Sequence, residues 1–144
     1  MRALTVTLLI LSSFACASPR ARIASSGGER CEGAAAHVDA LLREGLETYV
    51  TQMKRYAAAR DPEATTAGSE ARVRTHAEAW SKAHQPELAS ACRKWDDPQY
   101  RCVMDARLPA DLNACGLAEV VNDFTDEVVA DFARQPLDNP SAQR

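Results

Sequence analysis

The chain has 144 residues, of which 26% are charged, and a formal net charge of −3 at pH 7. The length fits one small domain, and the mildly acidic balance argues against nucleic acid or an anionic membrane surface as the main partner, because both require a basic stripe. With only three Phe, three Tyr and two Trp, the core has to be thin and built from small residues. Internal disulfides would stabilise such a core most effectively.

Residues 1–16 have the layout of an export signal. Arg2 supplies a positive start, residues 3–14 form an apolar run without charge, and small residues at positions 15–17 close it. The run is shorter than the roughly 20 residues that a permanent transmembrane helix needs. We therefore expect the chain to leave the cytoplasm.

Two processing routes compete for Cys16 at the end of this leader. Residues 13–16 resemble a lipobox, in which the cysteine is acylated and becomes the new N-terminus, although Ser13 replaces the usual Leu and Phe14 is bulkier than usual. Ordinary cleavage after Ala17 would instead remove Cys16 and release a periplasmic or secreted protein. We favour lipidation of Cys16 at the periplasmic or outer-membrane surface, because residues 17–30 are polar, rich in Ser and Gly and typical of a flexible tether.

Helical periodicity dominates residues 31–134, and strand alternation is nearly absent, which predicts a small all-α bundle of four to five helices. Apolar residues recur at three- and four-residue steps over residues 31–60, so this segment is predicted to be a long amphipathic helix. Asp61 ends it, because the proline that follows disfavours helix in the residue before it. A second long helix is expected to begin with Ser69 as its cap and to be kinked or split at Pro86. The two long helices, joined by the turn after residue 60, are expected to form an antiparallel hairpin.

Three shorter helices complete the expected domain. The first spans residues 98–107, with Asp97 as an Asx cap and proline at the first helical position. A short piece over residues 110–115 follows, and apolar residues at helical spacing define the last helix over residues 117–133. Residues 135–144 contain two prolines and are predicted to be a disordered tail.

Apart from Cys16, the chain has an even set of four cysteines, which is typical of a disulfide framework in an oxidising compartment. Cys31 and Cys92 are equidistant from the turn between the two long helices, and Cys102 and Cys115 are nearly symmetric about the break before the fourth helix. This symmetry favours the pairing 31–92 with 102–115. The alternative, 92–102 with 31–115, stays open, because Cys92 and Cys102 flank the two aspartates before the third helix symmetrically.

Signatures of a catalytic or metal site are missing from the sequence. There is no C-x-x-C, no G-x-S-x-G and no glycine-rich phosphate loop. Nine residues separate the nearest cysteines, whereas zinc ligands come in pairs about two to four residues apart. His76 and His84 would lie about 12 Å apart along one helix, too far to share a metal, and His37 is interpreted as a packing residue. We expect no catalytic, cofactor or metal residue; a cleft that united His84, Asp96 and Asp105 would contradict this expectation.

The order of these features, with the segments ACRKW, QYRCVMDA and LNAC within residues 91–115, resembles small exported helical proteins of bacteria that carry four cysteines. Many proteins of this kind are lipoproteins of unknown function. The resemblance implies a periplasmic or outer-surface location and supplies no catalytic residue.

We accordingly expect a non-enzymatic module of the cell envelope or surface, either structural or presenting helix faces to an envelope or extracellular protein. Acylation of Cys16 would link it to the membrane. The first alternative is a small carrier whose bundle encloses an apolar ligand. Aromatic side chains would line its cavity, namely Tyr49, Trp80, Trp95 and Phe124. The second alternative is an enzyme without a recognisable motif.

Overall fold

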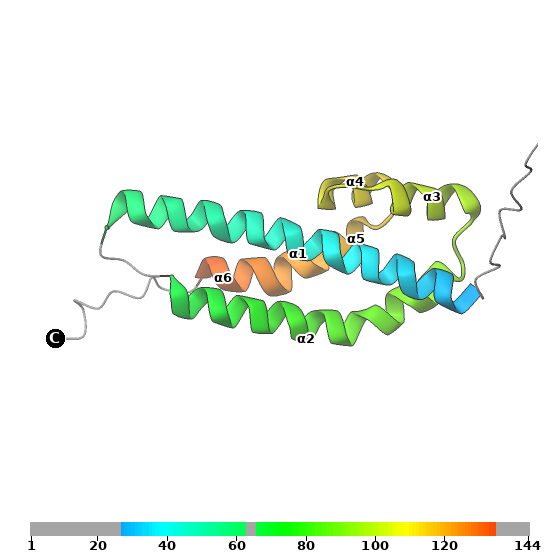
Figure 1. Cartoon of the computed structure of the whole chain (residues 1–144), viewed down its shortest axis with the longest axis horizontal. Helices are drawn as coiled ribbons and strands as arrows, with labels where there is room; N and C mark the ends of the chain where they lie inside the picture. Colours follow the sequence, from blue (N-terminus) through cyan, green and yellow to red (C-terminus); the bar gives the residue numbers. More distant parts are fainter. Residues whose placement is uncertain (1–26, 63–65, 135–144) are drawn as a thin grey trace, which may run out of the picture.

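The computed structural model describes residues 27–62 and 66–134, and within these ranges it contains helices and no strand. The expected all-α fold is therefore confirmed. Two long antiparallel helices form a hairpin, two short helices cover one end of it, and a C-terminal helix runs along it (Figure 1). The elements are α1 (Gly27–Arg60), α2 (Ala67–Cys92), α3 (Asp97–Asp105), α4 (Pro109–Ala114) and a C-terminal helix made of α5 (Ala118–Phe124), the π-helical turn η1 (Thr125–Val129) and α6 (Ala130–Arg134). The expected leader with Cys16 and the expected tail lie outside the described residues.

Helix α1 begins at Gly27, four residues before the position that the sequence predicts. Contacts with α3 hold this first turn. Arg30 Nη2 donates to Asp97 Oδ1 at 3.0 Å, and the guanidinium carbon of Arg30 lies 3.8 Å from the centroid of the Tyr100 ring. The last residues of the expected tether are therefore helical, because side chains distant in the sequence hold them in place.

Helix α2 also begins earlier than expected, at Ala67, so that Ser69 lies inside the helix and is buried instead of capping it. Thr66 holds the first turn: its hydroxyl donates to Glu70 Oε1 at 2.5 Å, and its carbonyl accepts the backbone N–H of Glu70 at 2.8 Å. Pro86 does not split the helix. The last turns of α2 rise towards α1 in Figure 1.

Helix α3 is capped by Asp96 instead of the expected Asp97. Asp96 Oδ1 accepts the backbone N–H of Gln99 at 2.8 Å, whereas Asp97 pairs with Arg30. Pro98 consequently occupies the second helical position, where the missing N–H removes no hydrogen bond, because the first four N–H groups of a helix have no partner within it.

Helix α4 packs closely against α1. Asp111 Oδ2 accepts the backbone N–H groups of Arg107 and Leu108, both at 2.9 Å, and this closes the sharp break between α3 and α4. The break brings the ring of Pro109 against Gly45, where an added Cβ atom would lie 2.7 Å from Pro109 Cγ. A glycine in the middle of this long helix is thus required by the close approach of α4.

Two disulfides staple the helices, Cys31–Cys92 and Cys102–Cys115, each with a Cα–Cα distance of 5.5 Å. This is the pairing that the symmetry argument favours, and the alternative pairing is wrong. The first bridge closes the open end of the hairpin across a sequence separation of 61 residues. By loop-closure entropy a bridge of this span stabilises the fold by about 4 kcal/mol. Two such bridges indicate an oxidising environment outside the cytoplasm.

Five elements contribute large, fully buried side chains to the core, namely Val38 and Val50 of α1, Val73 of α2, Val103 of α3, Leu112 of α4 and Val128 of η1. Small side chains dominate it, as the composition predicts. A buried polar contact crosses it as well, where Ser81 of α2 donates to one oxygen of Asp39 in α1 and Arg43 donates to the other at 3.0 Å. No helix within residues 27–62 and 66–134 is long and apolar enough to cross a bilayer.

Candidate functional site

A groove of about 150 Å³ lies between α2 and α5. Helix α2 supplies five of its side chains at steps of three and four residues, which places them on one face of the helix. We call it the Trp80 groove, and it is lined by Trp80, His84, Glu87, Leu88, Ala91, Val120 and Asp123.

The floor of the Trp80 groove is apolar and rigid. Trp80 and Leu88 are only 3% and 5% exposed, and the ring of Phe124 meets the Trp80 ring edge-on with their centroids 5.0 Å apart. Such an edge-to-face pair holds the indole in one orientation. The groove is therefore formed before any partner arrives.

The rim of the groove is polar. Asp123 Oδ2 accepts the indole N–H of Trp80 at 3.2 Å and lies 3.5 Å from His84 Nε2. The His84 ring stacks on Trp80 with the centroids 4.2 Å apart. Its Nδ1 lies 2.8 Å from the Trp80 carbonyl oxygen, so Nδ1 has to carry a hydrogen to make this bond. Glu87 adds a second carboxylate, which is exposed to solvent.

The lining of the Trp80 groove combines an apolar floor with a polar rim. His84 and Asp123 form an imidazole–carboxylate pair, but the side chains that line the Trp80 groove include no Ser, Thr, Cys or Lys that could act as a nucleophile beside it. An apolar floor with two carboxylates at its rim is suited to an apolar group that carries a cation next to it.

The four aromatic residues expected to line one ligand cavity do not share a site. Trp80 and Phe124 are in contact, but Trp95 packs beside the Cys31–Cys92 bridge at the open end of the hairpin and does not line the Trp80 groove. Tyr49 belongs to a second hollow of about 220 Å³, between α1, α4 and the C-terminal helix. We call it the Tyr49 hollow, and it is lined by Leu42, Gly45, Leu46, Tyr49, Pro109, Val121, Phe124, Thr125 and Val129. The prediction of one cavity lined by all four aromatic residues is therefore wrong, because Phe124 stands between the Trp80 groove and the Tyr49 hollow.

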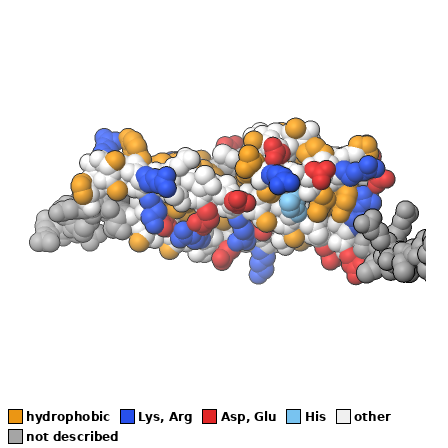
Figure 2. Space-filling view, turned by 45° about the horizontal axis from the view of Figure 1, so that its top comes forward, with side chains coloured by type: hydrophobic (Ala, Val, Ile, Leu, Met, Phe, Trp, Pro, Cys, Tyr) orange, Lys and Arg blue, Asp and Glu red, His pale blue; other side chains and the backbone are white. Residues whose placement is uncertain are grey.

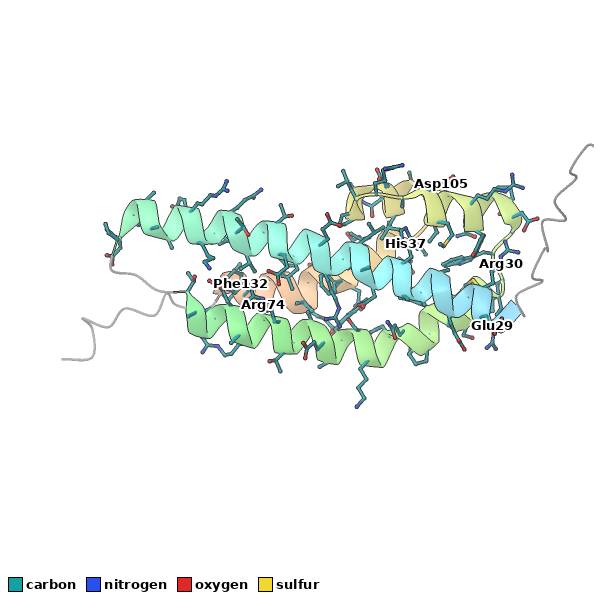
Figure 3. The ribbon with its side chains drawn as sticks, in the orientation of Figure 1. Glu29, Arg30, His37, Arg74, Asp105 and Phe132 are labelled. Atoms are coloured by element: carbon teal, nitrogen blue, oxygen red, sulfur yellow. A yellow bond between two sulfur atoms is a disulfide. The ribbon has the colours of Figure 1, made fainter. Side chains whose placement is uncertain are left out.

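The residues weighed as a hypothetical active site do not meet either. His84 faces Asp123, Asp96 caps α3, and Asp105 is exposed at the end of that helix (Figure 3). His37, on α1, has its Nε2 3.1 Å from the carbonyl oxygen of Ala106. Within residues 27–62 and 66–134 there is also no group of three or more His, Cys, Asp or Glu side chains placed to hold a metal ion.

Asp123 is the site residue that sequence reasoning missed. It lies eight residues before Asp131, and its partner His84 lies eight residues after His76. Because α2 and the C-terminal helix run antiparallel, both pairs form: His84 Nε2 is 3.5 Å from Asp123, and His76 Nδ1 is 3.7 Å from Asp131. The equal spacing of the two histidines and the two aspartates was the available signal.

A separate charged cluster joins α1 to α2 near the turn of the hairpin. Arg74, labelled in Figure 3, donates to both oxygens of Glu47 at 2.8 and 2.9 Å, and this hydrogen bonding lowers the pKa of Glu47. The hydrogen bond from Thr66, followed by that from Lys54, lowers the pKa of Glu70. Each carboxylate has its partners within the fold, so the cluster is structural.

The surface drawn in Figure 2 carries acidic and basic side chains interspersed with small apolar groups. No protein-family model, no curated protein and no solved structure matches the chain.

Proposed function

We propose that this chain is a non-enzymatic interaction module of the bacterial envelope, exported, held at the membrane by lipid on Cys16, and presenting the Trp80 groove to a partner protein. The observation that carries the proposal is the rigid apolar floor of Trp80 and Leu88 beneath the carboxylates of Asp123 and Glu87. Binding energy in protein interfaces concentrates in small pockets of this kind, where a few anchor groups are desolvated.

Two further features support this proposal. The disulfides are those expected of an exported domain, and they stabilise a thin core. The groove is built on helices, so its walls hold their positions, and preorganisation of this kind lowers the entropic cost of binding.

Site-specific photo-crosslinking in the bacterial host tests the interaction. A photoreactive amino acid at the exposed position Ala91, which leaves both rim carboxylates in place, should crosslink to one discrete envelope protein, and the crosslink should disappear when Val120→Arg fills the groove. The matched control positions are Glu44 and Arg55, which are exposed on α1. Equal crosslinking from groove and control positions, or none from the groove, contradicts the proposal.

The membrane link has its own test. Intact mass of the membrane-fraction protein should show a lipidated N-terminus at Cys16 together with two disulfides, and Cys16→Ala should move the protein out of that fraction. A mature chain that begins at Ser18 would show ordinary cleavage after Ala17. The proposed lipid anchor would then be wrong, because Cys16 would be removed with the leader.

A second candidate function, a carrier of a small apolar ligand, is favoured by the Tyr49 hollow. Its walls are nearly all apolar, and they include the π-helical turn, a feature that often marks functional sites. Saturable binding of a fluorescent fatty-acid probe that Val121→Arg abolishes and Val120→Arg leaves intact would support the carrier. Absence of saturable binding would reject it.

A further inference from the structure

The size of the Trp80 groove limits what can enter it. A cavity of about 150 Å³ lined by apolar side chains holds a group the size of benzene, and the Trp80 groove has about this volume. One Leu- or Phe-sized side chain therefore fills it, whereas a whole helix or an acyl chain does not. The apolar floor of the groove is formed by Trp80 and Leu88, both of which are buried.

The rim of the groove selects for a positive charge. The ionisable side chains that line it are Glu87, Asp123 and His84, so two of the three are carboxylates and none is Lys or Arg. The contacts of Asp123 with Trp80 and His84 both use Oδ2, which leaves Oδ1 without a partner among the described residues. Because the Asp123 side chain is 46% exposed, a donor on a partner can reach this oxygen from solvent.

We propose that the partner segment carries a leucine or aromatic side chain next to an arginine. The apolar side chain fills the groove against Trp80, and the guanidinium donates to Asp123 Oδ1 and to the carboxylate of Glu87. Arginine suits this rim better than lysine, since its planar fork supplies several donors at once to neighbouring carboxylates. The inference rests on the proposed function, and it adds the chemistry of the partner.

The test measures short peptides against the mature full-length protein, with the Trp80 indole as reporter. The ¹⁵N–¹H spectrum contains one indole signal from Trp80 and one from Trp95, and Trp95→Phe assigns them. The peptides are acetylated, amidated Arg-Leu-Arg, Arg-Ser-Arg, Glu-Leu-Glu and Lys-Leu-Lys. We expect Arg-Leu-Arg to shift the Trp80 signal saturably. Arg-Ser-Arg and Glu-Leu-Glu should bind with about tenfold lower affinity, and the affinity of Lys-Leu-Lys should be intermediate.

Variants assign the charge preference to the rim. Asp123→Asn should lower the affinity for Arg-Leu-Arg about tenfold. The preference for the Leu peptide over the Ser peptide should remain, because the apolar floor is intact. Asp126→Asn is the matched control on the exposed face of the C-terminal helix and should change nothing. Because Asp123 also accepts the Trp80 N–H, Glu87→Gln provides a second rim variant at an exposed position that holds no helix in place.

Several outcomes overturn the inference: equal affinities of Arg-Leu-Arg and Glu-Leu-Glu, equal affinities of the Leu and Ser peptides, or no saturable shift of the Trp80 signal. Crosslinking from Ala91 to an envelope protein would then still support the interaction module, and only the partner chemistry would fall. If the peptides bind as expected but Ala91 yields no crosslink, the groove chemistry stands and the proposed envelope function falls.

Discussion

The carboxylate of Asp123 accepts the indole N–H of Trp80 at 3.2 Å, and this bond joins the C-terminal helix to the middle of α2. Trp80 is almost fully buried, so its N–H needs an acceptor inside the fold. Asp123 Oδ2 also lies 3.5 Å from His84 Nε2. These two contacts fix the distance between α2 and α5, the helices that form the Trp80 groove. The bond therefore contributes both to stability and to the shape of the candidate site.

Replacing Trp80 by Phe should show how much this bond and the indole ring contribute to stability. The substitution removes the N–H donor and part of a buried ring, and we expect the free energy of unfolding to fall by about 2–3 kcal/mol. Urea unfolding followed by circular dichroism measures the change. Trp95→Phe is the control, because Trp95 is only partly buried beside the Cys31–Cys92 bridge, and its loss should be smaller. Equal losses would contradict a special role for the Trp80–Asp123 bond.

Gly45 and Gly33 offer a matched pair within α1. Alanine is the better helix former by about 1 kcal/mol, so Gly33→Ala, where an added Cβ has no neighbour within 4 Å, should raise stability by up to that amount. Gly45→Ala should instead lower it by about 1–3 kcal/mol, because the new Cβ collides with the Pro109 ring. Thermal unfolding of both variants measures the difference, and stabilisation by Gly45→Ala would show that α4 does not pack as described.

The two disulfides should contribute unequally. Removing the bridge across the hairpin with Cys31→Ala and Cys92→Ala should cost about 4 kcal/mol, and removing the shorter loop with Cys102→Ala and Cys115→Ala about 3 kcal/mol. Reducing agent should accordingly lower the melting temperature of the native protein. A melting temperature unaffected by reduction would mean that the cysteines are free, and the argument for an oxidising compartment would fail.

The charged cluster near the hairpin turn makes stability depend on pH in acid. The fold lowers the pKa of Glu47 and of Glu70 below their ordinary 4.5, so the unfolded chain binds more protons than the native state at mildly acidic pH. Their contribution is fully present above pH 4.5 and is lost as the pH falls through the lowered pKa values. Urea midpoints measured from pH 7 down to about 3 should show this decline.

Arg74→Gln distinguishes the contribution of this cluster to the pH dependence of stability from that of other acidic groups. Without Arg74, the pKa of Glu47 should return towards its ordinary value, and the loss of stability in acid should become shallower. Arg55→Gln, at an exposed position on the same hairpin, is the control and should leave the slope unchanged. Identical slopes in both variants would show that the contacts of Arg74 contribute nothing to the pH dependence.

Helix ends show where sequence reasoning reached its limit. The predicted first helix is correct over residues 31–60, because its apolar period is local, but its true start at Gly27 depends on the contacts of Arg30 with α3. Similarly, Ser69 is a good cap by residue type, yet the Thr66–Glu70 hydrogen bonds begin α2 earlier. Caps compete for partners that lie elsewhere in the fold, so residue type alone does not decide them.

The candidate site was predictable only in part. The sequence predicts Tyr49, Trp80, Trp95 and Phe124 as the lining of one cavity, but it does not show that Phe124 stands between two hollows or that Trp95 packs beside the Cys31–Cys92 bridge. Asp123 became visible only once α2 and the C-terminal helix were set antiparallel in one register. Register depends on how side chains interlock across helices, which is a property of the packed molecule.

The sequence alone determined the features that depend on local pattern, namely the helical class and the long hairpin. Symmetry about the turns favoured the pairing of Cys31 with Cys92 and of Cys102 with Cys115, and the tertiary structure decided it against the alternative. Helical period is repeated along the chain, and residues equidistant from the turn of a helical hairpin can come close to each other. Only the tertiary structure decided which side chains converge on the Trp80 groove. A site made by two helices far apart in the sequence exists only after their packing has fixed the distance between Trp80 and Asp123.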